Sequence, residues 1–141
     1  MFNQINYCNR KCLDPKAESP YARGLMQISR IALQEVKERY RLNYSYDDMF
    51  NPRKNVEVGA LYFKRLYNYY LTKYPFNPFA LNYAIMAYNF GIGIVNNWLK
   101  NTKPDNGYID EFIPKETREH LLDVMWLYAY YKNEKHPPAD K

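Results

Sequence analysis

Cysteine is scarce in this chain of 141 residues, and it has no long apolar run. Cys8 and Cys12 are its only cysteines. Two cysteines cannot frame a disulfide-rich fold, and a metal site would need more ligands, whereas His120 and His136 lie far away in sequence. We therefore interpret them as free thiols and expect no metal and no cofactor.

Signals for a membrane or for export are also missing. No stretch approaches the roughly 18 consecutive apolar residues of a membrane span. The polar residues 1–12 lack the apolar core of a signal peptide. We expect no membrane span, and we expect that any export signal would have to lie outside this sequence.

The positive charge is spread along the chain. A formal net charge of +5 would suit a polyanionic partner such as nucleic acid. However, acidic residues lie between the Lys and Arg residues, and no basic run or aromatic ribonucleoprotein pattern occurs. We therefore expect no nucleic-acid partner.

Aromatic residues are abundant, with 16 Tyr, 7 Phe and 2 Trp. Tyrosine combines a flat apolar face with a polar tip, which suits a partly hydrated core and also the stacking of sugar rings. The overall proportions, 47% apolar and 25% charged, are those of a folded globular chain. The length fits one domain.

Apolar residues recur with a helical period, and no strand pattern or internal repeat is visible. The strongest predicted helix starts where Pro52 follows Asn51, a typical helix start. Helices are predicted over residues 24–40, 52–70, 79–88, 92–99 and 114–131. Residues 101–107 have the composition of a loop. The predicted fold class is all-α.

Four short segments carry more specific information. They are the GLMQ sequence within residues 22–28, the segment 48–59 with its Pro, Asn and Gly, the AYNFG sequence within 87–98, and the Pro and ETR of 113–118. In this order they resemble the soluble lytic transglycosylases, bacterial enzymes of lysozyme-like fold that cut peptidoglycan. The resemblance covers roughly residues 13 to 131.

The resemblance implies an all-α, lysozyme-like domain of about five to six helices. It divides the chain into an atypical polar N-terminus at residues 1–12, with an altered or lost first helix, a domain at 13–132 and a solvated tail at 133–141. It also implies the bacterial cell envelope as the location and peptidoglycan glycan strands as the partner.

The family's substrate-binding positions correspond to Ser19, Met26, Gln27, Tyr88, Asn89 and Glu116. Gln27 offers a donor and an acceptor to an amide or a hydroxyl, as N-acetylated sugars require. Three of these residues also have a plain structural interpretation. Gln27 could satisfy a loop backbone, Tyr88 could pack in the core, and Glu116 could stabilise a helix start.

The catalytic position departs from the family pattern. In the preferred alignment the family's Glu-Ser pair is replaced by Arg10 and Lys11, and an arginine holds its proton too tightly to protonate a leaving oxygen. A rival alignment uses Glu18 and Ser19 as that pair, at the cost of a shorter linker before GLMQ. In the preferred alignment Glu18 is a solvated turn acid.

Two functions therefore remain open. In the first, a single carboxyl, Glu18, acts as acid and then base, and the bond between N-acetylmuramic acid and N-acetylglucosamine is cleaved to a 1,6-anhydro product. Such an acid needs a raised pKa, which an apolar and partly closed groove supplies. In the second, the domain is an inactive peptidoglycan-binding module or a truncated family member.

Overall fold

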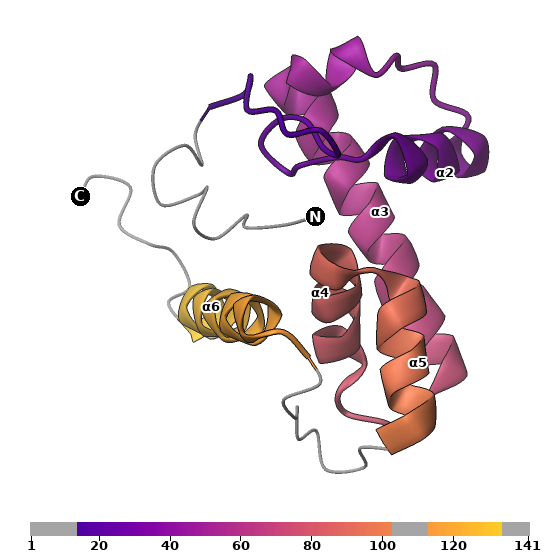
Figure 1. Cartoon of the computed structure of the whole chain (residues 1–141), viewed down its shortest axis with the longest axis vertical. Helices are drawn as coiled ribbons and strands as arrows, with labels where there is room; N and C mark the ends of the chain where they lie inside the picture. The colour runs from indigo at the N-terminus through magenta and orange to yellow at the C-terminus, as the bar shows by residue number, and fades with distance from the viewer. Residues whose placement is uncertain (1–13, 103–112, 134–141) are drawn as a thin grey trace. The chain divides into compact units, whose positions relative to one another are not determined.

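The computed structural model describes residues 14–102 and 113–133 (Figure 1). These residues form α2 at Arg30–Tyr40, the short 3-10 helix η1 at Asp47–Phe50, α3 at Pro52–Lys73, α4 at Ala80–Phe90, α5 at Ile92–Thr102 and α6 at Lys115–Asn133. Strand-like pairing within these two ranges is limited to isolated bridges in the loop before α2. The all-α prediction is confirmed.

The long helix α3 begins at the predicted residue. The side chain of Asn51 accepts a hydrogen bond from the backbone N–H of Lys54 at 3.1 Å, and Pro52 occupies the first helical position. The helix continues to Lys73, past the predicted end at residue 70. Because both start signals are local in sequence, this boundary was predictable without tertiary information.

The prediction of a helix over residues 24–40 is wrong in its first part. Gly24 and Gln27 have φ values of 77° and 49°, a left-handed conformation that interrupts a right-handed helix. Residues 24–28 therefore form a loop, and α2 begins only at Arg30. Its cap is Ser29, whose side chain accepts a hydrogen bond from the backbone N–H of Ala32 at 3.1 Å.

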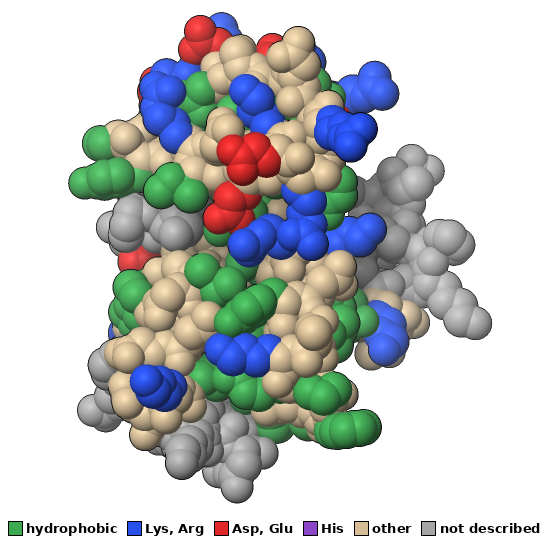
Figure 2. All heavy atoms as spheres, turned by 90° about the vertical axis from the view of Figure 1, so that its right-hand side faces the viewer, with side chains coloured by type: hydrophobic (Ala, Val, Ile, Leu, Met, Phe, Trp, Pro, Cys, Tyr) green, Lys and Arg blue, Asp and Glu red, His purple; other side chains and the backbone are tan. Residues whose placement is uncertain are grey.

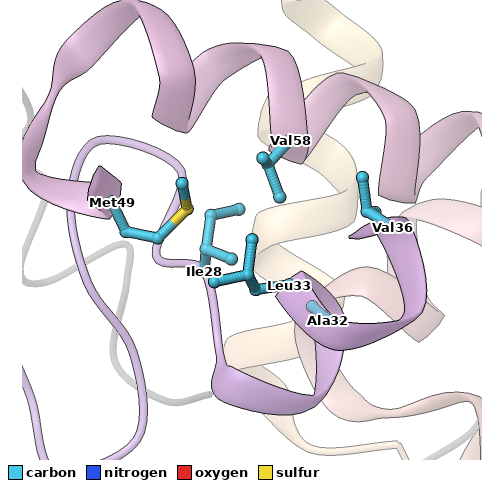
Figure 3. Packing of buried hydrophobic residues seen from close by; sticks show 6 residues of the cluster. All are labelled: Ile28, Ala32, Leu33, Val36, Met49 and Val58. Carbon is cyan, nitrogen blue, oxygen red and sulfur yellow. The ribbon is translucent and has the colours of Figure 1, made fainter. Parts of the chain in front are cut away.

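Contacts divide the chain into two compact units, and the boundary in sequence lies between Phe76 and Asn77. In the first unit, α2 packs against α3 and η1 packs against the start of α3. Figure 3 shows its apolar cluster, in which residues of α2 and the preceding loop meet Met49 of η1 and Val58 of α3. The members are Ile28, Ala32, Leu33, Val36, Met49 and Val58. This cluster anchors the GLMQ loop to α3.

In the second unit, α4 packs against both α5 and α6. Nearly every residue of α4 from Tyr83 to Asn89 is buried, which agrees with its apolar sequence. Tyr83 meets the edge of Trp98 of α5, with ring centroids 6.3 Å apart. The AYNFG and ETR sequences lie at the end of α4 and the start of α6.

Several sequence-based expectations fall outside the described residues or are not decided by them. Cys8, Cys12, Arg10 and Lys11 lie in the undescribed N-terminus, and most of the predicted loop at 101–107 and tail at 133–141 are also undescribed. The domain boundaries stay a prediction. None of the described helices has the length and hydropathy to cross a membrane. The described residues contain no cluster of three or more His, Cys, Asp or Glu that could hold a metal ion.

Candidate functional site

The GLMQ loop is held by one buried amide. Asn55 of α3 is fully buried, and its Oδ1 accepts a hydrogen bond from the backbone N–H of Met26 at 2.7 Å. Its Nδ2 donates to the carbonyl oxygens of Arg23 at 2.9 Å and Met49 at 2.8 Å. Asn55 thus joins the loop, η1 and α3, and buried polar groups satisfied in this way rigidify a fold.

Two glycines allow the loop to lie directly on α3. A Cβ atom at Gly24 would collide with the side chain of Asn55 and the carbonyl oxygen of Met49, and its φ of +77° also favours glycine. A Cβ atom at Gly59 would lie 2.8 Å from Cβ of Met26, closer than real atoms pack. The half-buried Met26 also packs against the apolar cluster of the first unit.

Gln27 uses the nitrogen of its amide within the loop. Its Nε2 donates to the carbonyl oxygen of Gly24 at 2.8 Å and lies 3.4 Å from that of Ala17. Its Oε1 accepts no hydrogen bond from another described residue. The side chain therefore supports the loop backbone and leaves Oε1 without a hydrogen bond from another described residue, and the backbone of Gln27 has the left-handed φ of 49°.

Glu18 and Ser19 lie in the turn that precedes this loop. The Oε1 atom of Glu18 lies 3.0 Å from Nε of Arg23, and the Glu18 side chain is 50% exposed. Arg23 also pairs with Asp47 at 2.8 Å, and its guanidinium covers the ring of Tyr46 at 4.2 Å. Glu18 is thus part of a surface ion-pair cluster, whereas a general acid needs an apolar and partly closed surrounding.

Ser19 has a local structural role. Its Oγ accepts hydrogen bonds from the backbone N–H groups of Tyr21 at 3.2 Å and Ala22 at 3.1 Å. This arrangement is a serine-capped turn. It sets the direction in which the chain enters the GLMQ loop.

The second unit holds the other predicted site residues. Unlike the amide of Asn55, some of their buried polar atoms have no hydrogen-bond partner among the described residues. Asn89, at the end of α4, is 2% exposed, and its Oδ1 accepts a hydrogen bond from Oγ1 of the buried Thr117 at 2.8 Å. Its Nδ2 is buried without a hydrogen-bond partner, as are Oε1 of Glu116 and Nε of Arg118. Three buried polar atoms near the start of α6 thus have no partner among the described residues.

Sequence reasoning identified Asn89 and Glu116 but missed the roles of Thr117 and Arg118. Thr117 joins α6 to α4 through its bond to Asn89, and Arg118 adds a buried and unpaired donor. Both belong to the ETR sequence that drew attention to Glu116, so the motif itself was the available signal. Tyr88, half-buried, immediately precedes Asn89 on α4.

The predicted site residues therefore fall into two groups. Glu18, Ser19, Met26 and Gln27 come together in the first unit, around the loop that Asn55 holds. In the second unit, α4 carries Tyr88 and Asn89, and Glu116 is next to Thr117, the residue that bonds Asn89. Each group offers hydrogen-bonding atoms of the kind that a polar ligand with amide and hydroxyl groups would use.

Comparisons with known proteins agree with these motifs. The family model of the transglycosylase SLT domain matches residues 10–110. The chain is 34% identical over 128 residues to the soluble lytic murein transglycosylase of Escherichia coli strain K12, covering 84% of this chain and 18% of that protein. The protein of the same name from Salmonella typhimurium is 34% identical over 131 residues, which cover 85% of this chain and 18% of the relative.

A further relative has a different name. The membrane-bound lytic murein transglycosylase F of Yersinia pseudotuberculosis is 27% identical over 116 residues, covering 82% of this chain and 22% of that protein. The chain thus spans only about a fifth of the length of the curated relatives that it matches. No solved structure matches the chain significantly.

Proposed function

The chain belongs to the transglycosylase SLT domain family, and we propose that it binds the glycan strands of peptidoglycan in the bacterial cell envelope. The observation that carries this proposal is that buried polar atoms of Asn89 at the end of α4, and of Glu116 and Arg118 in the first turn of α6, have no partner among the described residues. Leaving such atoms unpaired costs about 1–3 kcal/mol each, and a bound ligand with matching groups removes that cost.

N-acetylated sugars have the complementary groups. The acetamido carbonyl accepts a hydrogen bond, as the free Nδ2 of Asn89 requires, and hydroxyl groups donate, as Oε1 of Glu116 requires. In the first unit, Oε1 of Gln27 offers a further acceptor for an acetamido N–H. Tyr88 would contribute an aromatic face against a sugar ring. These assignments, with Ser19 and Met26 shaping the loop, are part of the proposal.

For cleavage we propose that this chain is weak or inactive. A lytic transglycosylase reaction needs one carboxyl that protonates the glycosidic oxygen and then removes the proton of the sugar's 6-hydroxyl, which closes the 1,6-anhydro ring. The preferred alignment puts Arg10 at that position. Glu18, the alternative acid, is half-exposed and paired with Arg23, so its surroundings do not favour proton transfer.

Binding is tested by sedimentation of the chain with insoluble peptidoglycan in rising salt. We expect part of the binding to survive moderate salt, because groove contacts are screened less than the net positive charge. Tyr88→Ala should reduce the retained fraction several-fold, whereas Tyr128→Ala, which removes an exposed tyrosine of α6, should not. Complete release by salt together with no effect of Tyr88→Ala would contradict a specific groove.

Cleavage is tested by mass spectrometry of the soluble products after digestion of purified peptidoglycan. We expect little or no 1,6-anhydro product from the unchanged chain. The paired substitution Arg10→Glu and Lys11→Ser should raise it by up to about 10²-fold if only the acid is missing. Robust activity of the unchanged chain that Glu18→Gln abolishes would instead establish the rival alignment. Activity that survives Glu18→Gln would direct attention to Glu116.

A further inference from the structure

A hollow of about 340 Å³ lies in the first unit, and no residue of the GLMQ, AYNFG or ETR sequences lines it. One side is Arg39 in the last turn of α2, and the other is a face of α3. The lining residues are Arg39, Arg65, Asn68, Tyr69, Thr72 and Lys73. The five α3 positions are spaced three, four, seven and eight residues from the first, so they share one helix face. None of the lining residues is acidic.

Arg65 is fixed in a way that leaves part of its guanidinium open. Its Nε lies 3.0 Å from Oε2 of Glu35 on α2, and the Arg65 side chain is only 28% exposed. Its two terminal nitrogens have no partner among the described residues, and the same is true of the guanidinium of Arg39. A planar guanidinium with free N–H groups binds the oxygens of carboxylates and phosphates in pairs.

The far end of the hollow carries a lysine that stays charged. Nζ of Lys73 donates a hydrogen bond to the hydroxyl oxygen of Tyr69 at 3.0 Å, and this bond raises the pKa of Lys73. An ammonium group has three donors, so further donors remain for a ligand. Thr72 and Asn68 add polar side chains that have no hydrogen-bond partner among the described residues.

The charge of the hollow distinguishes between possible anions. Three cations line it, and Glu35 behind Arg65 contributes one negative charge, which leaves a formal charge of +2. A monocarboxylate would neutralise half of this charge, whereas a phosphate dianion would neutralise all of it. On the face drawn in Figure 2, Lys and Arg side chains lie in several places, some of them beside Asp or Glu side chains. The volume lies within the range of small-ligand sites.

We propose that this hollow binds a phosphate group, either as free inorganic phosphate or as the phosphate monoester of a sugar. Arg39 of α2 and Arg65 of α3 would hold two phosphate oxygens, and Lys73 with Thr72, also on α3, would hold the third. This site is separate from the proposed glycan-binding residues, so it does not depend on the proposed function.

The test is a titration of the full ¹⁵N-labelled chain with inorganic phosphate at constant ionic strength, followed by NMR. We expect saturable shifts of the Asn68 side-chain amide and of the arginine Nε–H signals, in the millimolar range or tighter. The double variant Arg39→Gln with Lys73→Gln should weaken binding by at least about tenfold. The matched control, Arg53→Gln with Lys64→Gln, removes two charges from exposed positions of α3 outside the hollow and should change affinity less than about twofold.

A second titration with hexose 6-phosphate distinguishes the two sources. Tighter binding than inorganic phosphate indicates a sugar phosphate, and weaker binding indicates the free ion. Both ligands should bind better at pH 7.5 than at pH 5.5, because each carries more negative charge at the higher pH; the second pKa of a phosphate monoester is about 6, and that of inorganic phosphate is higher. The proposal is overturned if no saturable shift occurs, if the control variant loses as much affinity, or if the dicarboxylate succinate binds as tightly as phosphate. Circular dichroism of both variants verifies the fold.

Discussion

In the first unit, the buried amide of Asn55 bonds three backbone groups and has its nitrogen and its oxygen both in use. In the second unit, the equally buried amide of Asn89 bonds only Thr117 and leaves its nitrogen without a partner among the described residues. The two asparagines have the same chemistry and nearly the same burial. The difference is that every polar atom of the Asn55 amide is used by the fold, whereas the Asn89 amide keeps a donor that the described residues do not pair.

The packing around the two asparagines also differs. The GLMQ loop meets α3 so closely that Gly24 and Gly59 have no room for a side chain. At the end of α4, by contrast, a Cβ atom at Gly91 or at the nearby Gly93 would meet nothing within 4 Å. A loop that packs this closely on α3 and is hydrogen-bonded by Asn55 is a rigid support, and a rigid support fixes the position of the binding groups that it carries.

The largest expected effect compares the two asparagines directly. Asn55→Ala leaves the N–H of Met26 and two carbonyl groups unpaired, so we expect the free energy of unfolding to fall by about 3–5 kcal/mol. Asn89→Ala removes one hydrogen bond together with an unpaired donor, and should cost about 1 kcal/mol. Urea denaturation followed by circular dichroism measures both. Equal losses would show that the two amides play the same structural role.

A pair of glycine substitutions tests the packing half of the comparison. Gly59→Ala forces a methyl group against Met26 and should lower the free energy of unfolding by about 1–3 kcal/mol. Gly93→Ala, at an exposed helical position in α5 with open space around it, should raise that free energy by up to about 1 kcal/mol, since alanine favours a helix. The same thermal or urea melts provide the measurement. A stabilising Gly59→Ala would mean that the loop is less tightly seated than described.

A smaller effect is expected for the binding of peptidoglycan. Asn89→Ala should weaken retention on peptidoglycan by about fivefold to tenfold, the value of roughly one hydrogen bond. Asn97→Ala, at an exposed position of α5, is the matched control and should leave retention unchanged. Sedimentation at moderate salt with quantified protein gives the ratio. Unchanged retention of Asn89→Ala would remove the cluster at the start of α6 from the proposed groove.

Features that depend on neighbouring residues could be predicted from the sequence, whereas features that depend on residues far away in the sequence could not. The start of α3 was predictable because Asn51 and Pro52 act within one turn. The loop at 24–28 was taken for helix because its apolar spacing continues into α2. Its true conformation depends on Asn55, which bonds to Met26 across 29 residues of sequence.

The candidate site shows the same limit. The motifs identified Gln27, Asn89 and Glu116 as polar residues of interest, but their hydrogen-bonding state could not be read from the sequence. Whether an amide nitrogen is used by the fold or left open depends on which carbonyl groups packing brings near it. The ion pair that Glu18 forms with Arg23 likewise depends on a turn that folds the chain back on itself.

The smallest predicted effect is a difference between the two units in how their stability depends on pH. Burial lowers the pKa of His120 on α6 below its ordinary value of 6.5, and the charge of Asp123 opposes this only in part. A lowered pKa means that the unfolded chain takes up the proton first. The contribution of neutral His120 is therefore complete above pH 6.5 and is lost as pH falls below that value.

The first unit contains no histidine, and its lowered carboxyl pKa, that of Asp48 hydrogen-bonded to Lys54, affects stability only below an ordinary value of 3.8. Between pH 7.5 and 5, hydrogen-exchange protection factors should therefore fall for amides of α6 and stay constant for those of α3. His120→Gln should make the protection of α6 independent of pH in that range, because glutamine does not titrate. If the fall persists in His120→Gln, another group is responsible, and if α3 loses protection equally, the two units do not differ in the way proposed.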